Sequence, residues 1–378
     1  MSWVALKMLT GNRGKYLGII LGITFASLLI AQQSSIFWGL MQLTTSQIKD
    51  IEGAELWVMD RNVQFIDDIK PLSENDLYRV RGVEGVDWAV RLYKGLTRAR
   101  LSTGNFQQVI LIGLDDATLV GAPQKMLAGN LADLRKPDAV IIDEDGYHQL
   151  WPGEPLRTGR TFEMNDREAE IVGICKARRT FQTFPVVFAR YSQATLFAPR
   201  ERKVLSFVLA NGEKGLDPKV VCERIRKQTG LLALTRDDFA EKTIWYFFEK
   251  TGIPINFGIT VMLGFIVGTA IAGQTFYLFT IENIKQFGAL KAMGASNWHL
   301  VGMIVLQALV VGIIGYGLGV GLAALFGEFS RRAPKLAFSM HPYVLIGTGV
   351  AVLLISIMSS LLSMRKVMVL DPAVVFQG

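Results

Sequence analysis

Four long segments of this chain carry almost no charge, and they constrain its fold more than any other feature. They extend from about Tyr16 to Leu40, Pro254 to Ile281, Leu300 to Phe326 and Pro342 to Leu362. Each has at least about 20 residues, the length that a helix needs to cross a hydrocarbon core of roughly 30 Å. We therefore predict an α-helical membrane protein with four transmembrane helices. The alternative, buried helices of a large soluble protein, requires four such segments to be covered without a bilayer.

The net charge of the chain lies beside these segments. Residues 49–250 hold 30 basic and 30 acidic residues, and the rest of the chain holds 10 basic and 3 acidic residues. The net charge of +7 therefore flanks the apolar segments, which indicates membrane head groups as the partner. The sequence has no basic stripe interleaved with aromatic residues, so we expect no nucleic-acid binding.

Basic residues also predict the orientation in the membrane. They occur in the N-terminal region, in the loop between the second and third segments and in the C-terminal tail, at Lys7, Arg13, Lys15, Lys285, Lys291, Arg365 and Lys366. With four spans these regions share one side, and the positive-inside rule places that side in the cytoplasm. Residues 41–250 then lie outside. The loop with Arg331, Arg332 and Lys335 also lies outside, against the rule.

Glycine spacing within the spans favours close helix packing. Gly264 and Gly268 form one GxxxG pattern, and the residues Gly315, Gly317, Gly319 and Gly321 form two interleaved ones. Such patterns let helix backbones approach each other in lipid. The second run is not a dinucleotide fingerprint, because no strand precedes it and no acidic residue follows at about 20 positions. We expect Gly264, Gly268, Gly315 and Gly319 to lie in helix contacts.

The segment 41–250 has the composition of a globular α/β domain. Short β-rich runs occur at 109–114, 139–142, 169–174, 186–188 and 205–209, and helical patterns at 74–81, 218–229 and 236–250. The last helix is predicted to continue towards the second span with a break near Pro254. A similar extension of the first span through residues 44–48 would give a second stalk helix.

No catalytic, cofactor or metal motif is recognisable. The run Asp143-Glu144-Asp145-Gly146 is interpreted as a turn, with calcium binding as a lesser alternative. Residues 11–15 have their glycines too close together for a nucleotide-binding loop, so we expect no ATP hydrolysis by this chain. Cys175 and Cys222 could be two free thiols or a disulfide pair, and their spacing does not indicate a metal site.

The segment 282–296 reads ENIKQFGALKAMGAS and is short and amphipathic. We expect Phe287, Leu290 and Met293 on one side to fit a groove on a partner protein, and Gly288 and Gly294 to allow tight turns at its ends. The alternative is an ordinary loop lying on head groups. The segment resembles the E-I-G-x-L-R-A-L-G-A signature of the FtsX/MacB-like ABC permease family, although Gln286-Phe287 replaces the common Glu-Ile.

Other parts of the chain share this resemblance. Residues 3–9 look like the amphipathic cytoplasmic helix of the family, and residues 365–373 resemble its D-P-A-containing tail. The order along the chain, with one span, a large outer domain and then three further spans, is also that of the family. Residues 178–187, together with 113–115 and 173–174, make the outer domain similar to the MacB-like periplasmic domain, and most similar to DevC-type exporter permeases.

The resemblance implies a permease that uses a separate ABC ATPase. It implies a dimer of permeases in the inner membrane, a periplasmic adaptor and an outer-membrane channel. In such a permease the coupling residues that contact the ATPase would be Gln286, Phe287, Gly288, Leu290, Lys291, Met293, Gly294 and Ala295. The favoured function is export of a lipid, glycolipid or other amphiphile by mechanotransmission. Alternatives are a lipoprotein-sorting permease, an FtsX-like regulator of a periplasmic enzyme, and a membrane sensor without an ATPase.

The expected domain order follows from these assignments. It consists of an N-terminal cytoplasmic helix (1–15), span 1 (16–40), an outer α/β domain (41–250), span 2 (251–281), a coupling loop (282–299), span 3 (300–326), an outer loop (327–341), span 4 (342–362) and a cytoplasmic tail (363–378).

Overall fold

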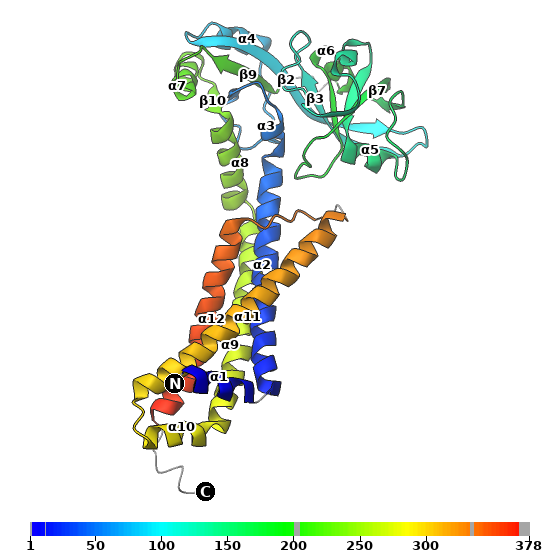
Figure 1. The fold of residues 1–378 in the computed structure, drawn as a ribbon. Coiled ribbons are helices and arrows are strands. Elements are labelled where there is room, and N and C mark those ends of the chain that lie inside the picture. Colours follow the sequence, from blue (N-terminus) through cyan, green and yellow to red (C-terminus); the bar gives the residue numbers. More distant parts are fainter. Residues whose placement is uncertain (1, 12, 200–204, 333–335, 370–378) are drawn as a thin grey trace. The chain divides into compact units, whose positions relative to one another are not determined.

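The computed structural model describes residues 2–11, 13–199, 205–332 and 336–369. The chain divides into a helical unit, formed by residues 1–40 and 252–378, and an inserted domain, formed by residues 41–251 (Figure 1). Each unit is built from its own sequence pattern.

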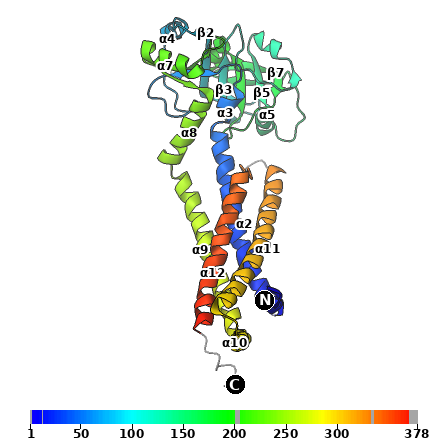
Figure 2. The same ribbon diagram turned by 60° about the vertical axis from the view of Figure 1, so that its left-hand side comes forward.

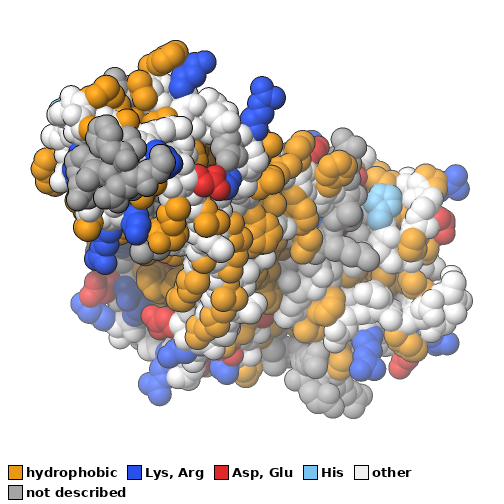
Figure 3. All heavy atoms as spheres, turned by 90° about the horizontal axis from the view of Figure 1, so that it is seen from below, with side chains coloured by type: hydrophobic (Ala, Val, Ile, Leu, Met, Phe, Trp, Pro, Cys, Tyr) orange, Lys and Arg blue, Asp and Glu red, His pale blue; other side chains and the backbone are white. Residues whose placement is uncertain are grey.

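Among its described residues the helical unit has four helices that are long and apolar enough to cross a membrane: α2 (Arg13–Thr44), α9 (Ile253–Glu282), α11 (Asn297–Arg332) and α12 (Pro342–Met368). This confirms the prediction of four apolar helices. The helix α2 continues past Leu40, α11 continues past Phe326 and α12 continues past Leu362, because their flanking residues are good helix formers. Large hydrophobic side chains are exposed on all four helices, among them Leu21, Ile259, Ile313 and Ile346. Hydrophobic side chains are also prominent when the molecule is seen from below (Figure 3).

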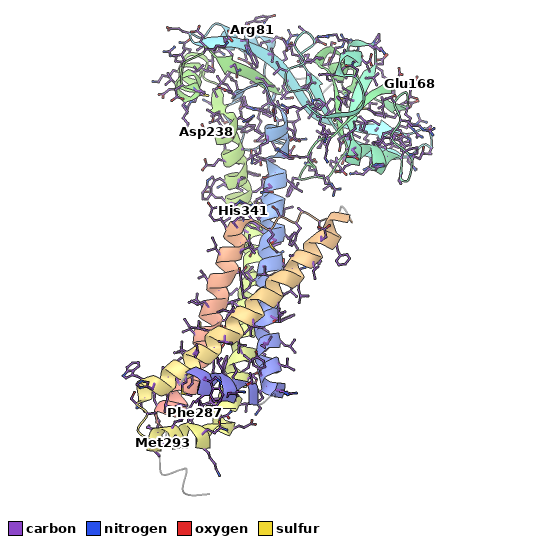
Figure 4. The ribbon with its side chains drawn as sticks, viewed as in Figure 1. Arg81, Glu168, Asp238, Phe287, Met293 and His341 are labelled. Atoms are coloured by element: carbon purple, nitrogen blue, oxygen red, sulfur yellow. The ribbon has the colours of Figure 1, made fainter. Side chains whose placement is uncertain are left out.

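Two shorter helices, α1 (Ser2–Gly11) and α10 (Ile284–Ala292), lie at the same end of this unit (Figures 1 and 2). At the other end His341 caps α12: its Nδ1 accepts the amide of Tyr343 at 3.4 Å, and its ring lies 4.9 Å from that of Trp38 (Figure 4). Pro342 is the first residue of α12, where its missing N–H leaves no bond unmade. Part of the predicted tail motif, residues 370–373, lies outside the described residues.

Small residues bring the spans of this unit together. A Cβ added at Gly264 would lie 3.3 Å from the Cβ of Leu29, and one added at Gly268 would overlap the Cβ of Ala26. Thus α9 packs closely on α2. Gly315 of α11 lies against the same helix, since its added Cβ would be 2.7 Å from Cγ2 of Ile23.

Only one of the two interleaved glycine patterns is used in this way. Gly319 faces Ser27 of α2, with 2.5 Å between an added Cβ and the serine Cβ. Gly317 and Gly321 have open space instead. On a helix of 3.6 residues per turn, positions 315 and 319 share one face while 317 and 321 lie on another.

The inserted domain contains one mixed sheet. Its strands within the described residues are β1 (Leu56–Met59), β2 (Val86–Arg100), β3 (Phe106–Leu114), β4 (Met126–Gly129), β5 (Ala139–Asp143), β6 (Thr161–Met164), β7 (Arg167–Cys175), β8 (Val186–Arg190), β9 (Phe207–Gly212) and β10 (Leu232–Thr235). The order is β10-β1-β9-β2-β3-β8-β5-β7-β4, and β6 pairs with both β2 and β7. The pairings β2-β3-β8-β5-β7-β6-β2 therefore close into a ring.

A tight turn closes the ring at β6 and β7. Their two-residue connection is Asn165-Asp166, with φ angles of 51° and 58°. Two consecutive left-handed residues match the twist of antiparallel strands, and Asn and Asp accept this conformation more readily than most residues. The inward faces of the ring strands then bury one apolar cluster that includes Val109, Ile142 and Phe162.

Outside residues 200–204, six helices complete the domain: α3 (Ser46–Asp50), α4 (Glu74–Arg81), α5 (Glu144–Leu150), α6 (Tyr191–Phe197), α7 (Pro218–Thr229) and α8 (Arg236–Lys250), together with a 3-10 turn at Leu131–Arg135. The predicted helices at 74–81, 218–229 and 236–250 are confirmed. The expected break after α8 lies at Thr251-Gly252, before α9 begins at Ile253.

Candidate functional site

The helix α10 and the turn after it form the segment that the sequence singles out for contact with a partner. Gly294 has a φ of +96°, which glycine adopts without strain. Its amide donates to the carbonyl of Lys291, and that of Ala295 donates to the carbonyl of Leu290, each at 3.0 Å. These two bonds make a Schellman motif that stops α10 sharply.

Phe287 lies in the interior of the helical unit. Its side chain is fully buried, in a cluster that gathers residues from α1, α11 and α12 around α10 (Figure 4). The buried members of this Phe287 cluster are Ala5, Phe287, Leu300, Met303, Ile304, Met364 and Val367. Movement of α10 would therefore displace three other helices with it, because close-packed interiors transmit displacement.

Polar contacts fix the same region. The ammonium of Lys291 donates to the carbonyl of Met368 at 3.2 Å, which joins the end of α10 to the end of α12. Lys15 of α2 pairs with Glu282, the last residue of α9. The side-chain amide of Gln307 donates to the carbonyl of Ala5 at 2.7 Å in a buried position, which holds α1 on α11.

The exposed face of α10 and its turn carries different residues from the buried one. Gln286 is exposed, and Met293 is 75% exposed, one heptad later on the same face. Trp298, at the start of α11, is 81% exposed. Exposed Met and Trp side chains are enriched at protein interfaces. The sequence analysis did not identify Trp298; its signal is a large aromatic residue directly after the resembling segment.

Two expectations for this segment are corrected. Phe287 does not share a face with Met293, because α10 turns it inward to the Phe287 cluster, and Leu290 is half-buried beside it. Gly288 is a buried residue in the middle of α10 and not a turn residue at its end. The apolar stripe in the sequence thus reflects packing within the chain, and Gln286, Met293 and Trp298 are left facing outward.

The acidic run in the inserted domain is a helix cap. Asp143 accepts the amide of Gly146 at 3.0 Å and begins α5, while Asp145 pairs with Arg179 at 2.7 Å. Burial of Asp143 raises its pKa to about 6. The carboxylate oxygens of Asp143 accept backbone amides. No group of metal-ligating side chains suited to a metal ion is found among the described residues. The calcium alternative is not supported.

Both cysteine thiols are buried and unbonded. Cys175 packs with the core that faces α3 and α8, and Cys222 packs in a different cluster beneath α4 and α7. Burial raises the pKa of both thiols, that of Cys222 to about 11. A thiol with a raised pKa is a poor nucleophile and a poor metal ligand, so packing explains both residues.

The stretch 178–187 ties the ring of strands to the two helices nearest the membrane segments in the sequence. The amide of Arg178 donates to Asp50 of α3 at 2.7 Å, and burial raises the pKa of that carboxyl. The ring of Phe181 lies 4.8 Å from that of Phe247 on α8. Force applied along α3 or α8 would therefore reach the ring of strands through this loop.

Comparison with protein families gives two matches that together cover most of the chain. Residues 16–228 match the MacB-like periplasmic core domain, and residues 252–372 match the FtsX-like permease C-terminal domain. The first match alone covers more than half of the chain. The second includes α10 and the Phe287 cluster residues of α11 and α12.

Relatives with curated sequences cover a smaller part. An uncharacterised ABC transporter permease of Mycobacterium tuberculosis is 28% identical over 123 residues, which are 32% of this chain and 34% of the relative. A protein of Staphylococcus haemolyticus, provisionally named hemin transport system permease protein HrtB, is 26% identical over 125 residues, 33% of this chain and 34% of the relative. The chain is thus aligned with about a third of the length of these relatives.

Two solved structures show a weak likeness to this chain. The extracellular domain of the ABC-type transporter YknZ from Gram-positive bacteria is 16% identical, covers 48% of this chain and 98% of that domain, and gives a TM-score of 0.36. The periplasmic region of MacB from Actinobacillus actinomycetemcomitans is 13% identical, covers 51% of this chain and 94% of that region, and also gives 0.36. The two family matches, in contrast, cover most of the chain, and this chain belongs to the FtsX/MacB type of ABC transporter permeases.

Proposed function

We propose that this permease is the membrane subunit of an exporter in which a separate ATPase pushes on α10. The buried Phe287 cluster carries the proposal, because it joins α10 to α1, α11 and α12 as one packed body. The outward-facing Gln286, Met293 and Trp298 supply a surface for the ATPase. The sequence of this chain has no nucleotide-binding loop, so ATP is hydrolysed by the partner.

The proposed orientation in the membrane follows from the basic residues that flank the spans. The side with α1, α10 and the C-terminal tail is the cytoplasmic side of the inner membrane, and the inserted domain is periplasmic. Two copies of the permease would form the working unit with two ATPase subunits. A periplasmic adaptor and an outer-membrane channel would complete the pathway. The closer likeness of residues 178–187 to DevC-type permeases is an argument for such an assembly.

The cargo that we favour is a lipid, glycolipid or other amphiphile. No acidic residue lies within the central, uncharged parts of the four spans, so an ion-coupled route through the helices has no intramembrane carboxylate to use. An amphiphile can instead be expelled from the outer leaflet or periplasm by motion of the inserted domain. A relative carries the provisional name of hemin transport system permease protein, and hemin is an amphiphilic molecule, which agrees with this class.

The test uses the permease reconstituted with its ATPase in proteoliposomes. Met293→Asp places a charge on the exposed face and should abolish permease-stimulated ATP hydrolysis and transport together. The apolar variant Met293→Leu should retain both. Gly288→Trp is unsuitable because Gly288 is buried within α10 and the variant would disturb folding.

The outcomes separate the competing functions. If Met293→Asp inserts normally into the membrane and still stimulates ATP hydrolysis as the wild type does, α10 is not the contact with the ATPase. Stimulated ATP hydrolysis with no loss of any amphiphile from the vesicles would favour an FtsX-like regulator. Release of a lipidated protein in place of a free lipid would favour lipoprotein sorting.

A further inference from the structure

The inserted domain contains an open pocket of about 490 Å³ that belongs to none of the features described so far. A loop after β1 forms one wall, and the last three turns of α8 form the other. Its lining residues are Arg61, Asn62, Val63, Gln64, Lys242, Trp245, Tyr246, Glu249 and Lys250. Three of these are cations and one is an acid, in a domain whose overall charge is balanced.

The loop wall is held rigidly. The buried ammonium of Lys94 on β2 pairs with Asp67 and donates to the carbonyl of Ile66 at 3.3 Å. The amide of Gln64 donates to Asp68 at 3.0 Å. These bonds fix the far end of the loop, and at the near end Asp60 accepts the amide of Asn62 at 2.8 Å. Both ends are held, so the position of Arg61 is a property of the fold.

Aromatic packing fixes the loop to α8. The ring of Phe65 stacks on that of Tyr246 at 4.2 Å with an angle of 16°, and lies edge-on to Phe247 at 5.5 Å. Such pairs add to the stabilisation that comes from burial of their area. Next to them the ring of Trp245 remains 52% exposed. The pocket therefore combines a rigid cationic rim with an exposed indole.

The three cations have no ion pair among the described residues. Exposed arginines elsewhere in the domain, such as Arg100 and Arg178, have a carboxylate partner. Arg61, Lys242 and Lys250 differ from single unpaired cations because all three line one pocket. Unpaired cations that converge on one pocket are suited to an anion, which Lys and Arg bind through charge-assisted hydrogen bonds.

The chain itself places this pocket near a bilayer surface. Lys250 ends α8, and Ile253 begins α9, one of the four candidate spans. Three residues of chain reach at most about 11 Å. Trp, Tyr and Lys at such a position are typical of the membrane interface, where indole and phenol rings lie among the head groups.

We propose that this pocket binds the phosphate head group of an anionic phospholipid of the adjoining leaflet. Arg61, Lys242 and Lys250 would hold the phosphate oxygens, and Trp245 would rest on the glycerol and upper acyl region. The inserted domain would thereby be anchored to the lipid surface through α8. This inference needs only that α9 spans a membrane, and it is independent of the ATPase contact at α10.

The test uses the full chain in mixed micelles of phosphatidylcholine and brominated phosphatidylglycerol. Bromine quenches the fluorescence of a nearby indole. The part of the quenching that is lost in Trp245→Phe therefore reports this pocket alone. We expect half-maximal quenching at a much lower fraction of brominated phosphatidylglycerol than of brominated phosphatidylcholine. The triple variant Arg61→Gln, Lys242→Gln, Lys250→Gln should lose this preference, by roughly fivefold in affinity for each cation removed.

A matched control removes three other exposed cations of the same domain: Lys125→Gln, Arg157→Gln and Lys214→Gln. It has the same net charge as the triple variant and should keep the preference. If the triple variant fails to fold, Arg61→Gln and Lys250→Gln are measured singly, since both side chains are exposed. Equal quenching by the two lipids in the wild type, or an unchanged preference in the folded charge variants, would overturn the proposal. Binding of inorganic phosphate at these cations together with equal quenching by the two lipids would indicate a site for the free ion instead.

Discussion

The carboxylate of Asp143 accepts the backbone amide of Val186 at 2.6 Å, although the two residues are 43 positions apart. Asp143 ends β5 and caps α5, and Val186 begins β8, the neighbouring strand. One buried side chain thus joins a strand, a helix and the loop that reaches α3 and α8. Burial raises its pKa to about 6, despite the two amides that favour the ionised form.

We predict that this carboxyl makes the inserted domain less stable as the pH rises from 4 to 7. Its pKa is about 6 in the folded state and 3.8 when unperturbed, so between these values the folded state holds the extra proton. Its stabilising contribution is complete below pH 3.8 and is lost as the pH passes 6. The difference of about 2 pH units corresponds to roughly 3 kcal/mol.

Asp143→Asn removes this titration and is the variant to compare. Denaturant unfolding of the full chain in micelles, followed by hydrogen exchange of strands β5 and β8, gives the stability of the domain. The stability of the wild type relative to the variant should fall as the pH rises from 4 to 7. A difference that stays constant between pH 4 and pH 7 would show that Asp143 does not titrate in this range.

The helix contact at Gly315 gives a second prediction. Gly315→Leu should destabilise the helical unit by about 1–3 kcal/mol, because its Cβ would meet Ile23 of α2 at 2.7 Å. Gly317→Leu is the matched control: the same change on the same helix, facing open space. Thermal unfolding in micelles should show a lower melting temperature for the first variant only. Equal losses in both would contradict a specific contact at position 315.

Local signals explain which elements of the inserted domain could be predicted from the sequence. The helix α4 begins at Ser73, whose side chain and that of Asp76 cap each other's backbone amides. The helix α7 begins with Asp217-Pro218 and ends at Gly230, which has a φ of +70°. Each of these helix ends is specified by a few adjacent residues. Residues that are far apart in the chain play no part in them.

Strands that depend on distant partners were missed. The longest, β2, contains Arg91, Lys94 and Gly95, which interrupt the apolar alternation expected of a strand. Its charges are accommodated only by partners from elsewhere, such as Glu74 for Arg91 and Asp67 for Lys94. The same reason explains the error at Phe287: a periodic pattern shows which face of α10 is apolar, but not which neighbours cover it.

The Phe287 cluster gives a third prediction. Phe287→Ala should destabilise the helical unit by about 3 kcal/mol, because it leaves a cavity between α10 and three helices. Met293→Ala is the control, since its side chain is 75% exposed. Hydrogen exchange should rise in α1 and in the ends of α11 and α12 for Phe287→Ala alone. Unchanged exchange in those three helices would contradict the role of this ring in joining them.

The bond from Gln307 to the carbonyl of Ala5 predicts how α1 is held. Gln307→Met keeps the size of the side chain but removes its donor, so α1 should detach more readily from α11, with a loss of about 1 kcal/mol. Gln42→Met, at an exposed position of α2, is the same change without a buried bond. Amide exchange in residues 2–11 should increase by roughly fivefold for Gln307→Met, the factor that corresponds to about 1 kcal/mol, and should stay at the wild-type rate for Gln42→Met. If residues 2–11 exchange equally in both variants, α1 is held by the packing of Ala5 and Leu9 rather than by this amide.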